Sequence, residues 1–531
     1  MRLFTTTAGL CCYLERHRQG KEVGLVPTMG ALHAGHLSLI ERARRENAIV
    51  IVSIFVNPLQ FGPTEDFQHY PRQLEEDRQL CEQLGVDAIF APTAVELYGN
   101  RLPTSAGGTE LTQVVPPAAM TSVLCGRSRT GHFQGVATVV TKLLNLVQPE
   151  RAYFGQKDAQ QLAIIRRLVT DLNLPVAIVA CPIVREDSGL ALSSRNQYLT
   201  QSQKAQAPVL FRALQQAQKV FQAGECDASF GKPLCDRTTL IEIVKSELAS
   251  VSDIQVEYVE LVHPTTLMPL DQVDDCGLLA IAARFGSTRL IDNVLLQQRK
   301  PIVAIDGPAG VGKSTVTRRV AKALGLMHLD TGAMYRAVTW RVLEAGIDLG
   351  DEPAIAELVS QSQICLTTDN ASGIAVRVWI DGEDVTQAIR SLEVTAHVSA
   401  IAAVPAVRRE LVKQQQRWGC KGGIVAEGRD VGTNVFPDAE LKIFLTASVQ
   451  ERARRRQQDL KDQELPSVSL EQLERDIQER DFRDSTRAVA PLRKAADAIE
   501  IETDNLSISD VTERIVTLYH QQVSKGLPEN K

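Results

Sequence analysis

The sequence predicts an α/β protein built from two halves, each organised around a parallel sheet. Strand-like apolar runs alternate with helical runs in both halves, a pattern typical of parallel sheets covered on both faces. Both halves also begin alike, with an apolar strand, a glycine-containing loop and a helix, at Val23–Gly30 and at Ile302–Gly312. A chain of 531 residues exceeds what one hydrophobic core can hold, so several folding units are expected.

The first half opens with a short strand and then a helix from Ala8 to Gln19. A signal peptide is a poor interpretation of this start, because three threonines interrupt its apolar stretch. After this start, the first half has the strand and loop at Val23–Gly30, continues with strand-like runs at Ala48–Val56, Val86–Ala91 and Val176–Ile183, and has a last strand at Leu279–Gly286. Those of the second half are Pro301–Asp306, Gly422–Ala426, Leu441–Leu445 and Ala498–Glu502.

A boundary between the halves is predicted near residue 297. The segment Leu295-Leu-Gln-Gln-Arg-Lys300 is short and polar, and it separates Thr288–Asn293 from the strand that opens the second half. A linker this short keeps the two halves close to each other.

Composition excludes several classes of function. With a net charge of −6, the chain gives no electrostatic support for nucleic-acid binding. No stretch approaches the roughly 20 apolar residues of a membrane span. The ten cysteines form no Cys-x-x-Cys pair and have no histidine at zinc spacing, so reduced thiols and a cytoplasmic location are expected. A catalytic or redox role for a single cysteine stays open, although a buried small hydrophobe is favoured.

A phosphate-binding loop is predicted at the start of the second half. Gly307-Pro-Ala-Gly-Val-Gly-Lys-Ser314 matches Gly-x4-Gly-Lys-Ser/Thr and lies between an apolar strand and a helix from Ser314 to Leu324. Backbone N–H groups freed by the glycines surround phosphates at the helix N-terminus. Lys313 adds a catalytic positive charge, and the Ser314 hydroxyl reaches Mg²⁺. The predicted ATP-binding residues are Gly307, Pro308, Ala309, Gly310, Val311, Gly312, Lys313, Ser314 and Thr315.

Further motifs indicate the acceptor of this half. They are Ile305-Asp-Gly-Pro308, Asp330-Thr-Gly-Ala-Met-Tyr-Arg336, Ile424-Val-Ala-Glu-Gly-Arg-Asp430 and Glu479-Arg-Asp-Phe-Arg-Asp-Ser-Thr-Arg487. Together they resemble the bacterial cytidylate kinases over about residues 301 to 520. That family carries a nucleotide-binding insert, which would correspond here to Leu366–Arg390 with a strand-like Ile374–Ile380.

The resemblance implies how CMP or dCMP would bind. A dianionic phosphate needs several guanidinium groups, and the matching positions are Arg336, Arg429 and Arg487, with Thr331 as a hydroxyl donor. By resemblance, Asp430, Arg408 and Ser399 read the base, while Asp484 and Arg480 hold the ribose. For any one of these arginines a surface ion pair is a plausible alternative, but not for the whole set.

The basic run Glu451-Arg-Ala-Arg-Arg-Arg456 favours a lid over a nucleic-acid surface. It falls on a helix flanked by acidic residues, in the region where cytidylate kinases carry the lid that closes over ATP. One or more of these arginines would then stabilise charge on the transferred phosphoryl group, without the sequence indicating which.

A second candidate site lies at Pro27-Thr-Met-Gly-Ala-Leu-His33-Ala-Gly-His36. Two histidines three positions apart on a first helical turn point the same way. Metal binding lacks a third ligand at sensible spacing, and simple packing is the plain alternative. The third interpretation is a nucleotidyltransferase signature, in which neutral imidazoles and the helix N-terminus contact the phosphates of ATP.

The surrounding motifs favour the third interpretation. They are Val56-Asn-Pro-Leu-Gln-Phe-Gly62, Gly131-His-Phe-Gln-Gly-Val136, Phe154-Gly-Gln-Lys-Asp-Ala-Gln-Gln161, Ala191-Leu-Ser-Ser-Arg-Asn196 and Ala283-Arg-Phe-Gly-Ser-Thr-Arg-Leu-Ile-Asp-Asn293. This set resembles the pantothenate synthetases (pantoate–β-alanine ligases) over about residues 1 to 293. Two departures are Thr130, where proline is expected, and Glu76 in the pair Glu76-Asp77, which leaves magnesium contact at Asp77 tentative.

The resemblance implies a doubly wound, Rossmann-like domain at residues 1–185, a small α/β lobe at 186–297, and a P-loop kinase domain at 298–531. It implies that ATP and pantoate form pantoyl adenylate, which β-alanine converts to pantothenate and AMP. His36 is placed as the catalytic histidine, with His33 and Lys157 beside it, and Gln60 and Gln161 bind pantoate or β-alanine. The implied ATP-binding residues are Met29, Gly30, His33, His36, Gly155, Lys157, Asp158, Val184, Leu192, Ser193, Ser194 and Arg195.

Small-molecule substrates, ATP and Mg²⁺ are therefore the expected partners, with no nucleic acid or membrane. The resemblance also implies a homodimer formed through the first half. Two alternatives stay open: both halves act on other substrates, or one half is a non-catalytic regulatory module.

Overall fold

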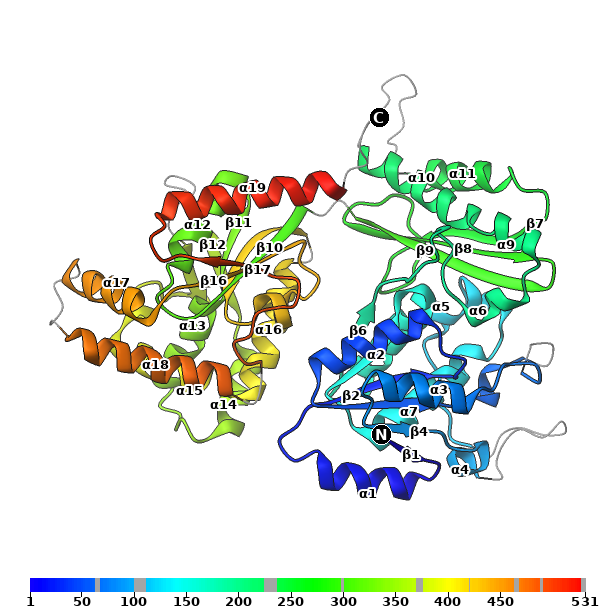
Figure 1. The fold of residues 1–531 in the computed structure, drawn as a ribbon, viewed down its shortest axis with the longest axis horizontal. Coiled ribbons are helices and arrows are strands. Elements are labelled where there is room, and N and C mark those ends of the chain that lie inside the picture. Colours follow the sequence, from blue (N-terminus) through cyan, green and yellow to red (C-terminus); the bar gives the residue numbers. More distant parts are fainter. Residues whose placement is uncertain are drawn as a thin grey trace. The chain divides into compact units, whose positions relative to one another are not determined.

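The computed structural model describes residues 1–62, 67–99, 111–223, 236–297, 300–368, 376–419, 421–462, 468–487 and 490–526. The chain divides into two compact units, unit 1 at Met1–Gln298 and unit 2 at Arg299–Lys531 (Figure 1). The predicted linker lies at this division, although its residues 298 and 299 are outside the described residues.

Unit 1 contains a six-stranded sheet in the order β1-β4-β3-β2-β5-β6. All its pairings are parallel, so the predicted parallel sheet is confirmed. Its strands are β1 (Arg2–Phe4), β2 (Val23–Thr28), β3 (Ile49–Ile54), β4 (Ala88–Phe90), β5 (Arg151–Gly155) and β6 (Ala177–Cys181). The apolar pattern does not predict β5, because this strand is short and begins with an arginine.

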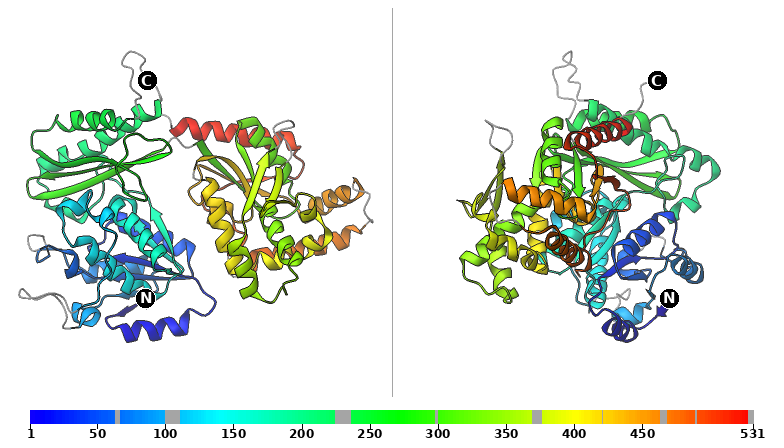
Figure 2. Two further views of the ribbon diagram at one scale, coloured as in Figure 1. Left: turned by 180° about the vertical axis from the view of Figure 1, so that it is seen from behind. Right: turned by 60° about the vertical axis from the view of Figure 1, so that its left-hand side comes forward.

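Helices cover both faces of this sheet (Figure 2). Ile49 and Ile51 of β3 pack with α1, α7 and α8, whereas Val50 and Val52 pack with α2 and α3. The alternation follows from the two-residue period of a strand. The helices of unit 1 are α1 (Thr7–His17), α2 (Ala34–Glu46), α3 (Leu74–Gln83), α4 (Ala94–Tyr98), α5 (Ala118–Thr121), α6 (Cys125–Ser128), α7 (His132–Val147), α8 (Ala159–Asp171), α9 (Gln201–Gln206), α10 (Val209–Ala223) and α11 (Arg237–Leu248), with 3-10 turns η1 (Pro58–Gln60), η2 (Gln156–Asp158) and η3 (Ser194–Tyr198).

A second, antiparallel sheet follows in unit 1, with α10 and α11 packed against it. Its strands are β7 (Ile254–Val262), β8 (Cys276–Phe285) and β9 (Thr288–Gln297), in that order. The prediction that Leu279–Gly286 is the last strand was wrong, because β9 follows it. Gly286, with φ of 58°, allows a two-residue turn that pairs Phe285 with Thr288.

Unit 2 is built on a five-stranded parallel sheet in the order β11-β15-β10-β16-β17. Its strands are β10 (Lys300–Asp306), β11 (Met327–Asp330), β15 (Gly422–Gly428), β16 (Leu441–Thr446) and β17 (Ile499–Glu502). A three-stranded antiparallel sheet joins β12 (Ile364–Thr368), β13 (Val376–Ile380) and β14 (Glu383–Asp384). Here β13 corresponds to the strand expected at Ile374–Ile380, and residues 369–375 of the expected insert lie outside the described residues.

Strand β10 is central, and its two faces meet different helices. Val303 and Ile305 pack with α12 and α19, while Ile302 and Ala304 pack with α13 and α16. The helices of unit 2 are α12 (Lys313–Leu324), α13 (Thr331–Glu344), α14 (Glu352–Gln361), α15 (Leu392–Ile401), α16 (Pro405–Gly419), α17 (Val449–Asp462), α18 (Leu470–Thr486) and α19 (Ile508–Gly526), with the 3-10 turn η4 (Ala388–Arg390) and the π-turn η5 (Val431–Val435).

The strand orders indicate where each unit can bind a ligand. In unit 1 the chain runs outward from β2 through β3 and β4 on one side, then continues with β5 and β6 on the other. In unit 2 the central β10 lies between β15 and β16. Ligands of open α/β sheets bind at such points, beyond the carboxyl ends of the strands. The loops after β2, β5, β10 and β15 therefore form the candidate sites.

Candidate active sites

The loop after β2 carries the paired histidines of unit 1 and is held by a buried carboxylate. Asp77 of α3 accepts N–H groups from Ala31 at 3.0 Å and Leu32 at 2.7 Å. Its side chain approaches so closely that a Cβ on Gly30 would lie 2.8 Å from its Oδ2 atom. Burial raises the pKa of Asp77, although the two N–H donors oppose this. Asp77 thus shapes the loop and does not line the cavity, so the geometry gives the tentative magnesium contact no support.

His33 and His36 face each other at the start of α2, with ring centroids 4.2 Å apart. His33 Nδ1 accepts the Gly35 N–H, and His36 Nδ1 accepts the His33 N–H. Burial lowers the pKa of His33 to about 4, and the positive charge of Lys157 adds to this shift. Burial also lowers the pKa of His36 to about 3, with smaller contributions from His33 and Lys157. Both imidazoles are therefore neutral at pH 7, with the proton on Nε2, where each can donate to a phosphate oxygen.

The loop after β5 brings Lys157 to the same place. Lys157 Nζ donates to Leu192 O at 3.1 Å. Burial lowers the pKa of Lys157, with Asp158 opposing this effect and Arg195 adding to it. From β9, the Asn293 amide donates to the carbonyl oxygens of Gln156 at 3.1 Å and Lys157 at 2.9 Å.

The opposite end of the cavity carries amides beside an apolar wall. Gln60 Nε2 donates to Met29 Sδ at 2.8 Å, and Asn57 Nδ2 donates to Gln60 Oε1 at 3.2 Å. The backbone carbonyl of Gln60 accepts a hydrogen bond from His132 Nδ1 at 2.8 Å, which leaves His132 Nε2 to accept from Arg129 at 3.0 Å. The wall consists of Phe55, Val136, Val139, Val140, Leu143 and Phe154.

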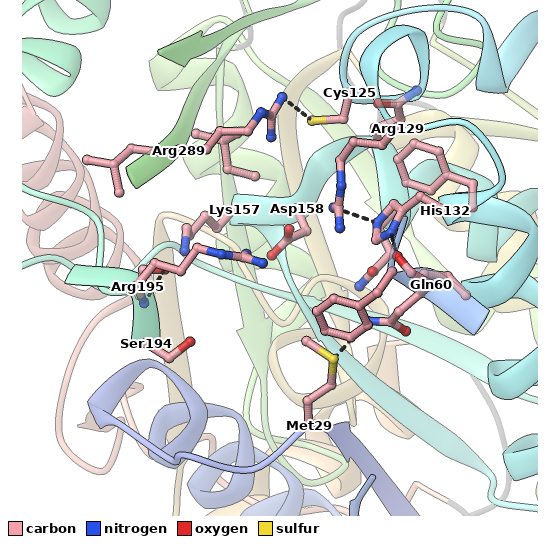
Figure 3. A pocket seen from close by; sticks show the side chains of 18 of the residues that line it. Met29, Gln60, Cys125, Arg129, His132, Lys157, Asp158, Ser194, Arg195 and Arg289 are labelled. Carbon is pink, nitrogen blue, oxygen red and sulfur yellow. Dashed lines mark hydrogen bonds between the residues drawn. The ribbon is translucent and has the colours of Figure 1, made fainter. Parts of the chain in front are cut away.

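These groups line one cavity of about 900 Å³ (Figure 3). Ten predicted residues line it: Met29, His33, His36, Gln60, Lys157, Asp158, Gln161, Ser193, Ser194 and Arg195. Gly30, Gly155, Val184 and Leu192 do not line it. The Leu192 N–H donates to Val184 O, so these two residues hold each other in place beside the cavity. Arg129, His132 and Asn293 also line the cavity without a predicted role. His132 and Asn293 belong to the motifs of the first half, which is the signal that could have identified them.

The predicted phosphate-binding loop of unit 2 joins β10 to α12. Gly307, Gly310 and Gly312 have φ values of 150°, 81° and 84°, which favour glycine. A Cβ on Gly307 would also lie 2.2 Å from the Leu445 carbonyl oxygen. Lys313 Nζ donates to the carbonyl oxygens of Gly307 at 2.8 Å and Pro308 at 2.6 Å. Burial holds the pKa of Lys313 well below its usual value.

Glu427 of β15 contacts the end of this loop, a role that the motifs alone do not predict. It accepts hydrogen bonds from Ser314 Oγ at 2.7 Å and His328 Nε2 at 2.9 Å. Burial raises the pKa of Glu427, but these donors outweigh it and the net shift is downward. An ionised carboxylate beside the Ser314 hydroxyl supplies the hard oxygen ligands that Mg²⁺ prefers. The Glu427 backbone carbonyl accepts from Thr331 Oγ1 at 2.7 Å.

Arginine–carboxylate pairs occupy the acceptor end. Arg408 pairs with Asp430, and Arg429 Nε donates to Asp484 Oδ2 at 3.0 Å. Arg487 lies 3.6 Å from Asp430. Burial, reinforced by Arg429, lowers the pKa of Arg480.

One cavity of about 1980 Å³ contains both the phosphate-binding loop and the acceptor end. All nine predicted CMP-binding residues line it: Thr331, Arg336, Ser399, Arg408, Arg429, Asp430, Arg480, Asp484 and Arg487. From the predicted ATP set, Ala309, Gly310, Val311, Gly312, Lys313, Ser314 and Thr315 line it, whereas Gly307 and Pro308 do not.

Among the described ranges, no three or more His, Cys, Asp or Glu side chains are arranged to hold a metal ion. No helix in those ranges has the length and apolar character needed to cross a membrane.

The two sites define the class of this protein: an α/β enzyme with one paired-histidine nucleotide site and one P-loop kinase site. A family model described as pantoate-beta-alanine ligase matches residues 2–295, and one described as cytidylate kinase matches residues 303–521. The chain belongs to the family of bifunctional pantoate ligase/cytidylate kinases, whose members carry both units in one polypeptide.

Relatives with that name match over most or all of their length. The protein from Trichormus variabilis is 63% identical over 99% of this chain and 100% of its own, and that from Trichodesmium erythraeum is 58% identical over 98% and 97%. The crystal structure of pantothenate synthetase from Thermus thermophilus is 46% identical and covers 55% of this chain and 99% of its own, with a TM-score of 0.49.

Proposed function

We propose that this chain catalyses two reactions, one in each unit. Unit 1 condenses (R)-pantoate with β-alanine, using ATP and releasing AMP and pyrophosphate. Unit 2 transfers the γ-phosphoryl group of ATP to CMP or dCMP. The observation that carries the proposal is that each unit joins a phosphate-handling end and an acceptor end within one cavity.

In unit 1 the cavity complements pantoate chemically. Gln60 and Gln161 are neutral amides that hydrogen-bond hydroxyls and a carboxylate without trapping charge as an over-stable salt bridge. The wall that includes Val136, Val139 and Val140 suits the gem-dimethyl carbon. Lys157 and Arg195 bring positive charge to the other end, where two anions must approach each other.

The first step joins the pantoate carboxylate to the α-phosphorus of ATP, breaks the bond to pyrophosphate and gives pantoyl adenylate. His33 and His36 donate from Nε2 to the phosphates as charge develops there. In the second step the neutral amine of β-alanine attacks the acyl carbon, AMP leaves, and the amine proton passes to solvent. The neutral imidazoles favour polarisation of phosphate over proton transfer by His36.

In unit 2 a phosphate oxygen of CMP attacks the γ-phosphorus, and the bond to the β–γ bridging oxygen breaks to release ADP. Lys313, which donates to Gly307 O and Pro308 O, would exchange these carbonyls for phosphate oxygens. Arg336, Arg429 and Arg487 would hold the acceptor phosphate. Mg²⁺, held by Ser314 and neighbouring Glu427 together with the phosphates, would neutralise phosphate charge.

Two coupled assays on the purified full chain with Mg-ATP test the proposal. One follows AMP release that requires both pantoate and β-alanine; the other follows ADP release with CMP, dCMP, UMP or AMP as acceptor. We expect AMP release only when pantoate and β-alanine are both present, and faster ADP release with CMP or dCMP than with UMP or AMP. A response in the CMP assay alone would contradict pantoate and β-alanine as the substrates of unit 1. A preference for UMP or AMP would contradict cytosine as the base that unit 2 recognises.

We also propose a homodimer formed through unit 1, on the strength of the resemblance to pantothenate synthetases. Sedimentation equilibrium of the full chain tests this state. A monomer at micromolar concentration would contradict it.

A further inference from the structure

A buried histidine, His328, lies beside the proposed magnesium ligands of unit 2. It is on β11 with 5% of its surface exposed, and it lines the same cavity as Ser314 and Glu427. The register of the sheet pairs His328 with Val425 of β15, so Glu427 lies two positions farther along that strand. Because side chains two positions apart share one face of a strand, His328 and Glu427 meet on the same face of the sheet.

The carboxylate of Glu427 lies between two hydrogen-bond donors. His328 Nε2 is 2.9 Å from Glu427 Oε1, and Ser314 Oγ is 2.7 Å from Glu427 Oε2. An ionised carboxylate only accepts hydrogen bonds, so His328 carries a hydrogen on Nε2 and donates it to Glu427. Each carboxylate oxygen therefore has its own donor, and the two together fix the orientation of the carboxylate.

The hydrogen bond with Glu427 is the only one that His328 forms within the described ranges. Its second ring nitrogen, Nδ1, is buried there without a hydrogen-bond partner. A buried polar atom without a partner costs free energy, and an apolar side chain would fill the position without that cost. Simple packing therefore does not explain a histidine here, whereas the donor to Glu427 does.

Without this donor, neighbouring charges would act on Glu427 unopposed. Lys313 of the phosphate-binding loop attracts it electrostatically. Asp330, whose pKa is raised by burial and then by Glu427, repels it. A carboxylate that turned toward Lys313 would lose its hydrogen bond with Ser314, and the two proposed side-chain ligands of Mg²⁺ would no longer lie together. His328 opposes this turn because it holds Oε1.

We propose that His328 is a positioning residue for the magnesium site of unit 2, whose Nε2 donor keeps Glu427 directed to Ser314. His328 does not bind the metal ion itself and takes part in no covalent step. This inference rests on the proposed kinase activity and on the proposed roles of Ser314 and Glu427. Hydrogen-bond partners of metal ligands commonly contribute about 10- to 100-fold in metal affinity or activity.

The test measures metal binding in unit 2 of the full chain directly. Mn²⁺ replaces Mg²⁺, and β,γ-imido-ATP replaces ATP so that no phosphoryl group is transferred. Broadening of the phosphorus NMR resonance of bound CMP then reports only Mn²⁺ close to CMP. We expect His328→Leu to raise the Mn²⁺ concentration for half-maximal broadening about 10-fold or more. His328→Gln should stay within about threefold of the parent, because its side-chain amide can donate in place of Nε2.

Kinase kinetics supply a second readout. For His328→Leu, the Mg²⁺ concentration that gives half of the maximal rate should rise in parallel with the Mn²⁺ value. At saturating Mg²⁺, kcat and KM for CMP should each change by less than about threefold, whereas a general structural defect would lower kcat at every Mg²⁺ concentration. Met327→Leu is the matched control, since Met327 precedes His328 on β11, faces the opposite side and packs in the hydrophobic core. It should alter none of these values.

CMP binding in the absence of metal shows that unit 2 of each variant is folded. If the leucine variant does not bind CMP, His328→Asn takes its place, because its amide is too short to reach Glu427. Metal affinity within about threefold of the parent in the variant that lacks the donor, or an equal loss in His328→Gln, would overturn the assignment. A parent chain that does not phosphorylate CMP would instead overturn the proposed function.

Discussion

Asp306, at the end of β10, shows how one buried carboxylate positions several site residues. It accepts the N–H groups of Val431 at 2.8 Å and Gly432 at 2.7 Å, and so holds the turn that follows Arg429 and Asp430. Burial raises its pKa to about 6, even though these two donors oppose the shift. Only the ionised form accepts both N–H groups, because a protonated carboxyl turns one oxygen into a donor.

We therefore expect kinase turnover to fall as the pH is lowered through about 6, where Asp306 takes up a proton. Asp306→Asn should lower turnover about 10- to 100-fold at pH 7.5, because a misplaced turn shifts Arg429 and Asp430. The variant should also lack the inflection near pH 6, since an amide does not titrate. The measurement is kcat against pH for both proteins, and an inflection retained by the variant would assign it to another group.

Gly135 matters for a different reason, since its backbone is in close contact with η1. A Cβ at this position would lie 2.2 Å from the Leu59 carbonyl oxygen. We expect Gly135→Ala to push α7 and η1 apart, displacing Gln60 and lowering the free energy of unfolding of unit 1 by about 1–3 kcal/mol. KM for pantoate should rise while kinase kinetics stay unchanged. Denaturant unfolding and pantoate saturation curves check this, and an unchanged KM would show that η1 adapts without moving Gln60.

At the scale of elements, β9 reaches from the antiparallel sheet of unit 1 to the loops of the parallel sheet. Asn293 holds the carbonyl oxygens of Gln156 and Lys157, and neighbouring Asp292 pairs with Arg185 at 2.6 Å. Asp292 is almost completely buried. The strand therefore supports the segment that carries Lys157, and truncating one partner of such a contact leaves buried polar groups unpaired.

We expect Asn293→Ala to lower the ligase kcat about 10- to 100-fold, because Lys157 is less well positioned. Leu295→Ala is the matched control, since Leu295 lies on the same strand with 43% of its surface exposed. Exposed positions away from special contacts change stability by only about 0.5 kcal/mol. Pantothenate formation measures both variants, and equal losses in the two would indicate general damage to β9 rather than lost support of Lys157.

At the scale of the whole molecule, the two sites lie in separate compact units, each with its own sheet and core. The proposed reactions share no intermediate and both only consume ATP. Nothing in the chemistry therefore requires one site to depend on the other.

We expect Lys313→Ala to reduce CMP phosphorylation by about 100-fold or more and to leave pantothenate formation unchanged. His36→Asn should have the reciprocal effect. Both activities are measured on each full-length variant. A fall in both activities caused by either change would show that the units are coupled.

Much of this architecture could be predicted because it depends on local sequence. Apolar runs such as Ala48–Val56 form strands, and Gly307, Gly310 and Gly312 indicate a loop whose backbone needs positive φ. Elements without such a signal were missed: β5 is short, and β9 follows a turn that the pattern did not separate from the expected last strand. The roles of individual site residues stay predictions.

The spacing of residues along the chain is enough to predict two nucleotide sites, because closely spaced residues such as His33 and His36, or Gly312 and Lys313, carry the chemistry. The side chains that support those sites are identified by contacts between distant parts of the chain. Asp77 contacts a loop 45 residues away and Asn293 one 136 residues away. The physical reason is that burial and hydrogen-bond partners arise from long-range packing, which the spacing of residues along a chain does not encode.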